Sequence, residues 1–146
     1  MVCVEPIANY SKNIKKASNT EVITSTFDKF TSKDKFDLIT AFGVMHYFNT
    51  QEALKIYKHL RNFVKNHSKL IIRNHFGLDN KVTINKFSDE LNMHYFSEYR
   101  TVKEEVSLLD SVGFNYVDLV DIYPSSANRF TDTHHYVLVV EFNESI

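Results

Sequence analysis

The chain has 146 residues, 43% of them hydrophobic and 14% aromatic, so it can bury a core and is expected to form a single domain over residues 1–146. Its net charge is −1, with acidic and basic residues interspersed, which argues against a nucleic-acid or membrane partner. The single cysteine, Cys3, excludes an intramolecular disulfide and favours a cytoplasmic setting, and three glycines are too few for a glycine-rich nucleotide loop.

The first predicted element is a short strand, Val2 to Glu5, followed by a helical pattern from Ile7 to Ala17. An apolar run that ends in an acid and leads into a helix is typical of a βα unit in a nucleotide-binding sheet. A carboxylate in that place can accept hydrogen bonds from both hydroxyls of a ribose. The alternative is that Glu5 is exposed and stabilises the N-terminus of the following helix.

A second strand is predicted at Glu21 to Ser25, where β-branched residues are frequent. The central stretch, Phe36 to Phe48, reads FDLITAFGVMHYF. Its nearly continuous apolar run, broken by Gly43, predicts a strand that is buried on both faces of a parallel sheet. Ligands bind at the carboxyl ends of such strands, so chemistry is expected near His46 and its neighbours. The alternative is a core strand followed by a half-buried aromatic turn.

An amphipathic helix is predicted from Ala53 to Val64, with its N-cap at Asn49 and Thr50. Its basic side is expected to be a solvated face and not a binding patch. Lys69 to Asn74 is predicted to be another interior strand, and His75 follows at its carboxyl end.

The C-terminal part is predicted to contain one helix and two strands. Val102 to Val112 has a helical apolar stripe that ends at Gly113. Tyr116 to Tyr123 alternates apolar and acidic residues, as an edge-side strand with one wet face does, and His135 to Phe142 is strongly β-prone. Because no crossover helix separates these two strands, they are expected to pair antiparallel.

Metal and nucleophilic sites are not predicted. The only adjacent histidines, His134 and His135, would point to opposite faces of a strand. Cys3 falls inside a predicted buried strand, where a structural role is expected. The sequence has no nucleophile-elbow or zinc-protease motif.

The stretch FDLITAFGVMHYF resembles the fourth strand of class I S-adenosylmethionine-dependent methyltransferases, with an early Asp, a hydrophobic run and a Val-x-His-aromatic turn. The segments from Val2 to Phe142 follow the order of that family. The resemblance implies a three-layer, Rossmann-like α/β fold with strand order 3-2-1-4-5-7-6, mostly parallel with an antiparallel C-terminal strand. Because the match begins at the family's second strand, the first strand and its glycine-rich motif are expected to be missing, which makes the domain N-terminally truncated.

The cofactor that the resemblance implies is S-adenosylmethionine. Glu5 matches the ribose-binding acid of the family, with Pro6 and Ile7 beside the adenine. After the next strand the family often has an Asp near the adenine amine, and this chain departs from it with Thr26, or with Asp28 one slip along. The implied cofactor-binding residues are Glu5, Pro6, Ile7, Thr26, Phe27, Ala41, Phe42 and Gly43.

Residues 78–100 match an insertion that varies with substrate in the family and supplies much of the acceptor site. The alternative is a lid helix that packs its aromatic side chains on the core. The implied acceptor-binding residues are Tyr47, Tyr95, Tyr99 and Arg100. His46 and His75 are the candidates for a catalytic base, because imidazole titrates near neutral pH.

The expected function is methyl transfer to an oxygen or nitrogen of a small-molecule acceptor, such as a sugar or another metabolite. The alternative is a catalytically inactive methyltransferase-like subunit or fragment that needs a partner chain. Without a first strand, two strand edges lack partners, and each unsatisfied buried backbone group costs about 1 to 3 kcal/mol. The two halves would then pair directly, form a homodimer through the open edges, or receive the strand from a partner chain.

Overall fold

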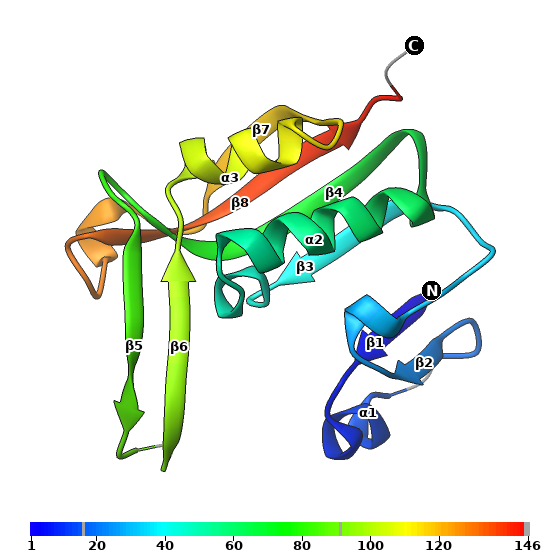
Figure 1. The fold of residues 1–146 in the computed structure, drawn as a ribbon, viewed down its shortest axis with the longest axis horizontal. Helices are drawn as coiled ribbons and strands as arrows, with labels where there is room; N and C mark the ends of the chain where they lie inside the picture. Colours follow the sequence, from blue (N-terminus) through cyan, green and yellow to red (C-terminus); the bar gives the residue numbers. More distant parts are fainter. Residues whose placement is uncertain (16, 91, 145–146) are drawn as a thin grey trace. The chain divides into compact units, whose positions relative to one another are not determined.

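A computed structural model describes residues 1–15, 17–90 and 92–144 (Figure 1). The chain, for which the sequence predicts a single domain, divides into two compact units, Met1–Asp34 and Lys35–Ile146. The elements in chain order are β1 (Val2–Glu5), α1 (Ala8–Asn13), β2 (Glu21–Thr24), η1 (Phe27–Lys29), β3 (Phe36–Phe42), η2 (Met45–Tyr47), α2 (Thr50–Leu60), η3 (Arg61–Phe63), β4 (Val64–Gly77), β5 (Val82–Ser88), β6 (Met93–Tyr99), α3 (Val102–Asp110), β7 (Phe114–Asp121), η4 (Ser125–Ala127) and β8 (Thr133–Phe142).

The first unit is a small parallel βαβ arrangement. Strands β1 and β2 pair in parallel with Glu5 opposite Thr24, so both predicted strands are present. Helix α1 is shorter than the predicted helix over 7–17, because Ile14 already has an extended ψ of 117°. Serine and asparagine are weak helix formers. The hydroxyl of Ser11 also lies 2.7 Å from that of Thr24, which ties α1 to β2.

The second unit contains a mixed four-stranded sheet in the order β3-β4-β8-β7. Strands β3 and β4 are parallel, whereas β8 is antiparallel to both β4 and β7. This arrangement confirms the predicted antiparallel placement of the last strand between two earlier ones. In the part of the chain that the structure describes, β1 and β2 form a sheet of their own.

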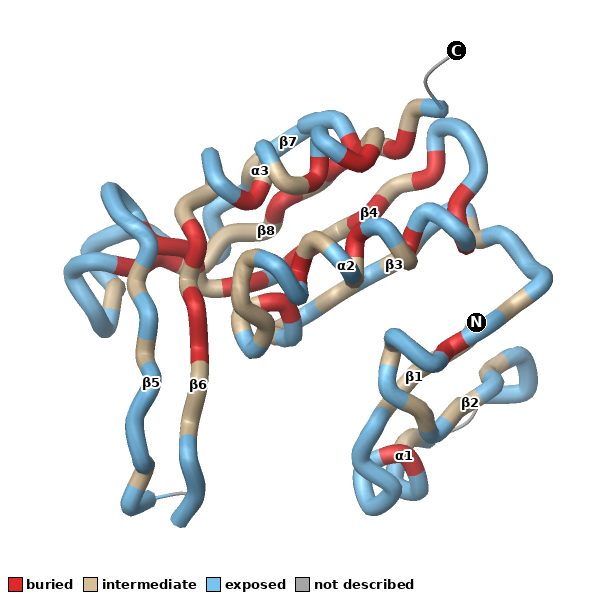
Figure 2. The backbone as a smooth tube through the Cα atoms, viewed as in Figure 1, coloured by how far each residue is buried: buried red, intermediate tan, exposed pale blue. Residues whose placement is uncertain are grey.

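Helices α2 and α3 cover one face of the four-stranded sheet (Figure 2). On that face Leu70 and Ile72 of β4 lie opposite Val140 and Leu138 of β8, and all four side chains are fully buried. Both helices begin with a capping box, formed by Asn49 with Glu52 in α2 and by Thr101 with Glu104 in α3. These caps satisfy backbone N–H groups that a helix start leaves without partners.

The opposite face of β3 is open to solvent. Leu38 and Phe42 are 54% and 53% exposed, so the prediction that this strand is buried on both faces is wrong for the described structure. The parallel pairing was predicted correctly. The physical reason for the difference is that β3 is an edge strand of its sheet and the helices of this unit cover the other face. The described residues of this unit therefore form two layers of the three that were expected.

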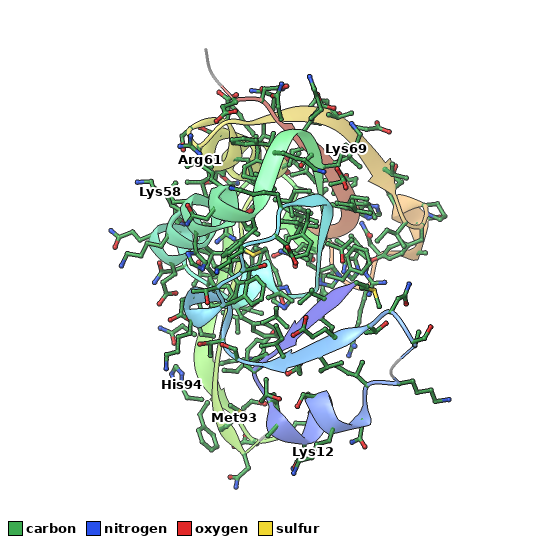
Figure 3. The ribbon with its side chains drawn as sticks, turned by 90° about the vertical axis from the view of Figure 1, so that its right-hand side faces the viewer. Lys12, Lys58, Arg61, Lys69, Met93 and His94 are labelled. Carbon is green, nitrogen blue, oxygen red and sulfur yellow. The ribbon has the colours of Figure 1, made fainter. Side chains whose placement is uncertain are left out.

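The basic side of α2 projects into solvent, as predicted. Figure 3 shows Lys58 and Arg61 pointing outward, and Lys55 and Lys65 are exposed as well. The guanidinium of Arg61 lies 5.7 Å from the centroid of the Phe142 ring. Among the described residues, no helix combines the length and the apolar character needed to cross a membrane.

Residues 78–100, predicted to be a substrate or lid insertion, contain an antiparallel hairpin made of β5 and β6. The alternative of a lid helix is wrong. The hairpin extends away from the four-stranded sheet (Figure 1), and Phe87 and Met93, in its outer half, are each 56% exposed. The base of the hairpin is buried. Ser97 and Glu98, near the C-terminal end of β6, are both buried side chains. The hairpin thereby brings the second half of β6 close to η2.

Candidate functional site

The carboxyl ends of β1 and β2 lie at one edge of the first unit, because the two strands are parallel. This edge carries five of the predicted cofactor-binding residues: Glu5, Pro6, Ile7, Thr26 and Phe27. Oε1 of Glu5 accepts a hydrogen bond of 2.9 Å from the backbone N–H of Ile7, the residue before α1. A carboxylate can accept about four hydrogen bonds, so Glu5 keeps the capacity to bind the hydroxyls of a ribose.

The remaining predicted cofactor-binding residues, Ala41, Phe42 and Gly43, lie at the carboxyl end of β3 in the second unit. Gly43 has a φ of 65° and donates its backbone N–H to the carbonyl of Arg73 at 2.8 Å. The guanidinium of Arg73 lies 5.8 Å from the centroid of the Phe42 ring. One face of the Phe42 ring is therefore in contact with a cationic side chain of the protein itself.

The η2 turn follows Gly43 and carries His46 and Tyr47. Nδ1 of His46 lies 2.6 Å from Oδ1 of Asn74 on β4. Because an amide oxygen only accepts, this bond places the proton on Nδ1 and leaves the lone pair on Nε2. His46 is thus held in the form in which its outer nitrogen can take up a proton.

Arg100 holds the η2 turn from inside the protein. Its side chain is 1% exposed, and its Nη2 and Nη1 atoms donate to the carbonyls of Met45 and Phe48 at 2.9 and 2.8 Å. Nε donates to Glu105 at 2.5 Å, and further bonds reach Glu98 and the second oxygen of Glu105. With its five N–H groups engaged, Arg100 has none left for an acceptor. The predicted substrate-binding role is therefore replaced by a positioning role.

Burial and charge act in opposite directions in this buried network. Burial disfavours the charged guanidinium, but the neighbouring Glu105 carboxylate outweighs it and raises the pKa of Arg100. Tyr57 on α2 donates its hydroxyl to Glu105, and burial followed by this carboxylate raises the pKa of that phenol well above its usual range. Arg100 therefore stays charged and the phenol of Tyr57 stays protonated at neutral pH.

An aromatic cluster spans the carboxyl ends of β3 and β4 and the base of the hairpin. Its members are His46, Tyr47, His75, Tyr95, Tyr99 and His135. Ring centroids are separated by 6.2 Å for Tyr95 and Tyr47, and by 4.2 Å for Tyr47 and His46. The structure thus brings together the predicted base candidates and three of the four predicted acceptor residues.

The other side of the cluster is built around His75. The ring of Tyr99 lies 5.6 Å from His46 and 5.6 Å from His75, and the rings of His75 and His135 are 3.9 Å apart. His135 was not among the site residues predicted from the sequence. An antiparallel last strand was predicted, but its register, which pairs His135 directly with His75 across β4 and β8, is not encoded in a local pattern.

The imidazoles of the cluster are held in the neutral form. Burial lowers the pKa of His46, although its hydrogen bond to Asn74 acts in the opposite direction, and burial also lowers the pKa of His75. Burial and then the charges of His75 and Arg73 lower the pKa of His135 to about 4. A neutral imidazole is the form that accepts a proton from an O–H or N–H group. No three His, Cys, Asp or Glu side chains within residues 1–15, 17–90 and 92–144 are grouped to hold a metal ion.

Solved structures similar to this chain are methyltransferases. One is the 1,6-didemethyltoxoflavin-N1-methyltransferase of Burkholderia thailandensis with bound 1,6-didemethyltoxoflavin and S-adenosylhomocysteine, at a TM-score of 0.72 and 12% identity over 98% of this chain. A putative S-adenosylmethionine-dependent methyltransferase of Listeria monocytogenes has a TM-score of 0.75 at 11% identity over 98% of this chain. The N-methyltransferase NodS of Bradyrhizobium japonicum, in complex with S-adenosylhomocysteine, has a TM-score of 0.65 at 10% identity over 98% of this chain.

The similarity lies in the fold and not in the sequence. This chain spans 61% of the Burkholderia protein, 80% of the Listeria protein and 66% of NodS. No model of a known protein family and no curated protein sequence matches it. The comparisons confirm that the chain has the α/β fold of class I S-adenosylmethionine-dependent methyltransferases, as the resemblance implied.

Proposed function

We propose that this chain, which has the class I methyltransferase fold, transfers a methyl group from S-adenosylmethionine to an oxygen or nitrogen of a small-molecule acceptor. The observation that carries the proposal is the aromatic cluster with its neutral imidazoles at the carboxyl ends of β3 and β4. In an open α/β sheet this is the end where ligands bind. The net charge of −1 favours a small acceptor over nucleic acid.

The residues present fit part of the cofactor. When bound, S-adenosylmethionine supplies a methyl group that is already activated by the sulfonium, so the protein mainly has to orient the acceptor and exclude water. Glu5 would bind the ribose hydroxyls, and Phe42 or Tyr47 would favour the sulfonium charge through a ring face. The other residues proposed to contact the cofactor are Pro6, Ile7, Thr26, Phe27, Ala41 and Gly43. None of the three glycines of this chain directly follows β1, and they lie too far apart in the sequence to form a glycine-rich loop.

His46 and His75 are proposed to handle the proton. When the acceptor oxygen or nitrogen takes up the methyl group in exchange for its proton, an imidazole nitrogen would accept that proton. For His46 this nitrogen is Nε2, because Asn74 engages Nδ1. Arg100 contributes by fixing the turn that carries His46.

The cofactor assignment is tested by calorimetric titration of the chain with S-adenosylhomocysteine. Glu5→Gln is expected to weaken binding about 10- to 100-fold, because hydrogen bonds to a charged group contribute about 1.5 to 3 kcal/mol. The matched control is Glu21→Gln, since Glu21 is an exposed acid at the opposite end of the same two-stranded sheet. Equal affinities of the two variants would remove Glu5 from the proposed site.

The proton-transfer assignment is tested by turnover of His46→Gln, with His94→Gln as its control. His94 is exposed on the hairpin, as Figure 3 shows. Loss of a positioned base is expected to lower kcat about 100-fold or more, whereas His94→Gln keeps the wild-type value. An unchanged kcat in His46→Gln, with His75→Gln also unaffected, would contradict the assignment.

A further inference from the structure

The aromatic cluster offers a ligand flat ring faces, with polar groups at the hydroxyls of its tyrosines and the nitrogens of its imidazoles. Its six rings come from η2, β4, β6 and β8, so segments far apart in the sequence meet in one surface of the second unit. His75, His135, Tyr95 and Tyr99 are half-buried, and Tyr47 is 51% exposed. Half-exposed rings with mutual centroid distances between 3.9 and 6.2 Å present faces and edges to which another ring can be added.

Two polar side chains beside the cluster, Asn74 and Glu98, are already engaged within the protein. Asn74 bonds to His46, and Glu98 accepts from Thr50 at 2.6 Å and from Arg100 at 3.3 Å. A sugar or another polyol needs several donors and acceptors, because each hydroxyl left without a partner loses its bonds to water. A polyol would therefore depend on the tyrosine hydroxyls and imidazole nitrogens of the cluster itself for its hydrogen bonds, whereas a planar ring needs one polar contact at its reacting atom and can use the ring faces for the rest.

We propose that the methyl acceptor is a planar aromatic or heteroaromatic compound that stacks on the aromatic cluster, and that His135 is a contact residue for it. The inference rests on the proposed function and narrows its acceptor class from small molecules in general to planar rings. His135 stands opposite His75 in register and extends the ring surface from β4 onto β8. The ring of His135 thereby favours planar acceptors over non-planar ones, while His46 and His75 receive the proton.

The test measures binding without the cofactor, so it does not depend on methyl transfer. The probe is 1-naphthol, and the matched ligand controls are decahydro-1-naphthol, its saturated analogue, and methyl α-glucoside. Each is titrated into the full chain while the imidazole C2–H resonances are followed by NMR. 1-Naphthol is expected to shift the resonances of His75 and His135 saturably, with the exposed His94 unmoved. Both controls are expected to bind about tenfold more weakly or not at all.

Variants connect the binding to the named rings. His135→Leu and Tyr99→Leu are each expected to weaken 1-naphthol binding about fivefold, while His94→Leu leaves it unchanged. Circular dichroism of each variant verifies the fold, and the two cluster variants serve as independent tests. The proposal is overturned if the saturated analogue or the glucoside binds as well as 1-naphthol, or if both cluster variants bind with wild-type affinity.

The outcomes separate this inference from the proposed function. If S-adenosylhomocysteine binds and 1-naphthol does not, the aromatic acceptor is refuted and the methyltransferase proposal stands. If 1-naphthol binds at the cluster and S-adenosylhomocysteine does not, the ring site stands and methyl transfer by this chain is refuted.

Discussion

Arg100 joins three segments of the second unit through one side chain. It bonds to the carbonyl of Met45, the first residue of η2, and to that of Phe48 just after this turn. It also bonds to Glu98 of β6 and to Glu105 of α3. Burial of a charge is stabilising only when its partners are present, since removal of one partner leaves the other charge without compensation. Glu105 is 1% exposed and would be left in that state.

Replacement of Arg100 by Met is therefore expected to lower the free energy of unfolding by about 3 to 5 kcal/mol in urea titrations. Arg129→Met is the control, because Arg129 is exposed and lies over the ring of Phe130. We expect that control to change stability by less than about 0.5 kcal/mol. If the free energy of unfolding of Arg100→Met fell by less than about 1 kcal/mol, the expectation would be wrong, and water or a shifted side chain would be compensating the buried Glu105 side chain.

His135 predicts a dependence of stability on pH. It is faced by His75 and Arg73 from β4, by His46 from η2 and by His134 from its own strand, and its pKa is lowered from 6.5 to about 4. Between these values the unfolded chain binds more protons than the folded chain at this position, so the contribution of His135 to stability falls as the pH falls. NMR titration of its C2–H resonance is expected to give a midpoint near 4.

The comparison variant for this titration is His135→Gln, which cannot be protonated. Its free energy of unfolding is expected to fall less than that of the wild type between pH 7 and pH 5. A midpoint at or above 6.5 for His135, or identical pH profiles for the two proteins, would contradict the neutral state assigned to this ring.

At the scale of elements, two glycines define where β3 and β4 end. Gly77, at the end of β4, lies so close to the next turn that an added Cβ would stand 2.1 Å from the carbonyl oxygen of Asn80. Gly43, after β3, has open space around it but a φ of 65°. The first position is restricted by close approach of backbone, and the second by conformation alone.

These two causes predict that alanine substitutions at Gly43 and Gly77 lower the stability of the protein by different amounts. Gly43→Ala is expected to cost about 1 to 2 kcal/mol in urea titrations, the price of a left-handed conformation for a residue with a Cβ. Gly77→Ala is expected to cost more, because the backbone of the turn has to move. Gly43→Asn serves as the rescue variant, since asparagine tolerates this conformation better. A smaller loss for Gly77→Ala than for Gly43→Ala would contradict the contact with Asn80.

The hairpin shows why element type was harder to predict between residues 78 and 100. Its sequence mixes polar and aromatic residues without the apolar period of either a helix or a buried strand. Both strands are largely exposed in their outer halves, so burial imposes little pattern on them. The start of α2 at Asn49 was easier, because capping depends on residues that are neighbours in sequence.

At the scale of the whole molecule, the two units differ in how much they bury. Among the described residues of Met1–Asp34, Ser11 and Phe30 are the buried ones, whereas the second unit has a continuous core along β4 and β8. Regions with few buried apolar contacts open locally at low free energy. Each unit is therefore expected to have its own stability.

Hydrogen exchange measured by mass spectrometry is expected to report this difference. Peptides from β1 and β2 should exchange at least about tenfold faster than peptides from β4 and β8, because local opening of the first unit exposes less apolar surface. The exposed outer part of the hairpin provides an internal reference for rapid exchange. Equal protection of β1 and β4 would show that the chain unfolds as one cooperative unit.

The sequence by itself determined the strands at Val2–Glu5 and Phe36–Phe42, the N-cap of α2, and the antiparallel last strand. These depend on local periodicity, capping and the lack of a crossover helix, which neighbouring residues encode. Only the tertiary structure decided that His135 meets His75 and that Arg100 faces inward. The reason is that cross-strand register and the pairing of buried charges depend on atoms contributed by distant segments, whose distances a linear pattern does not contain.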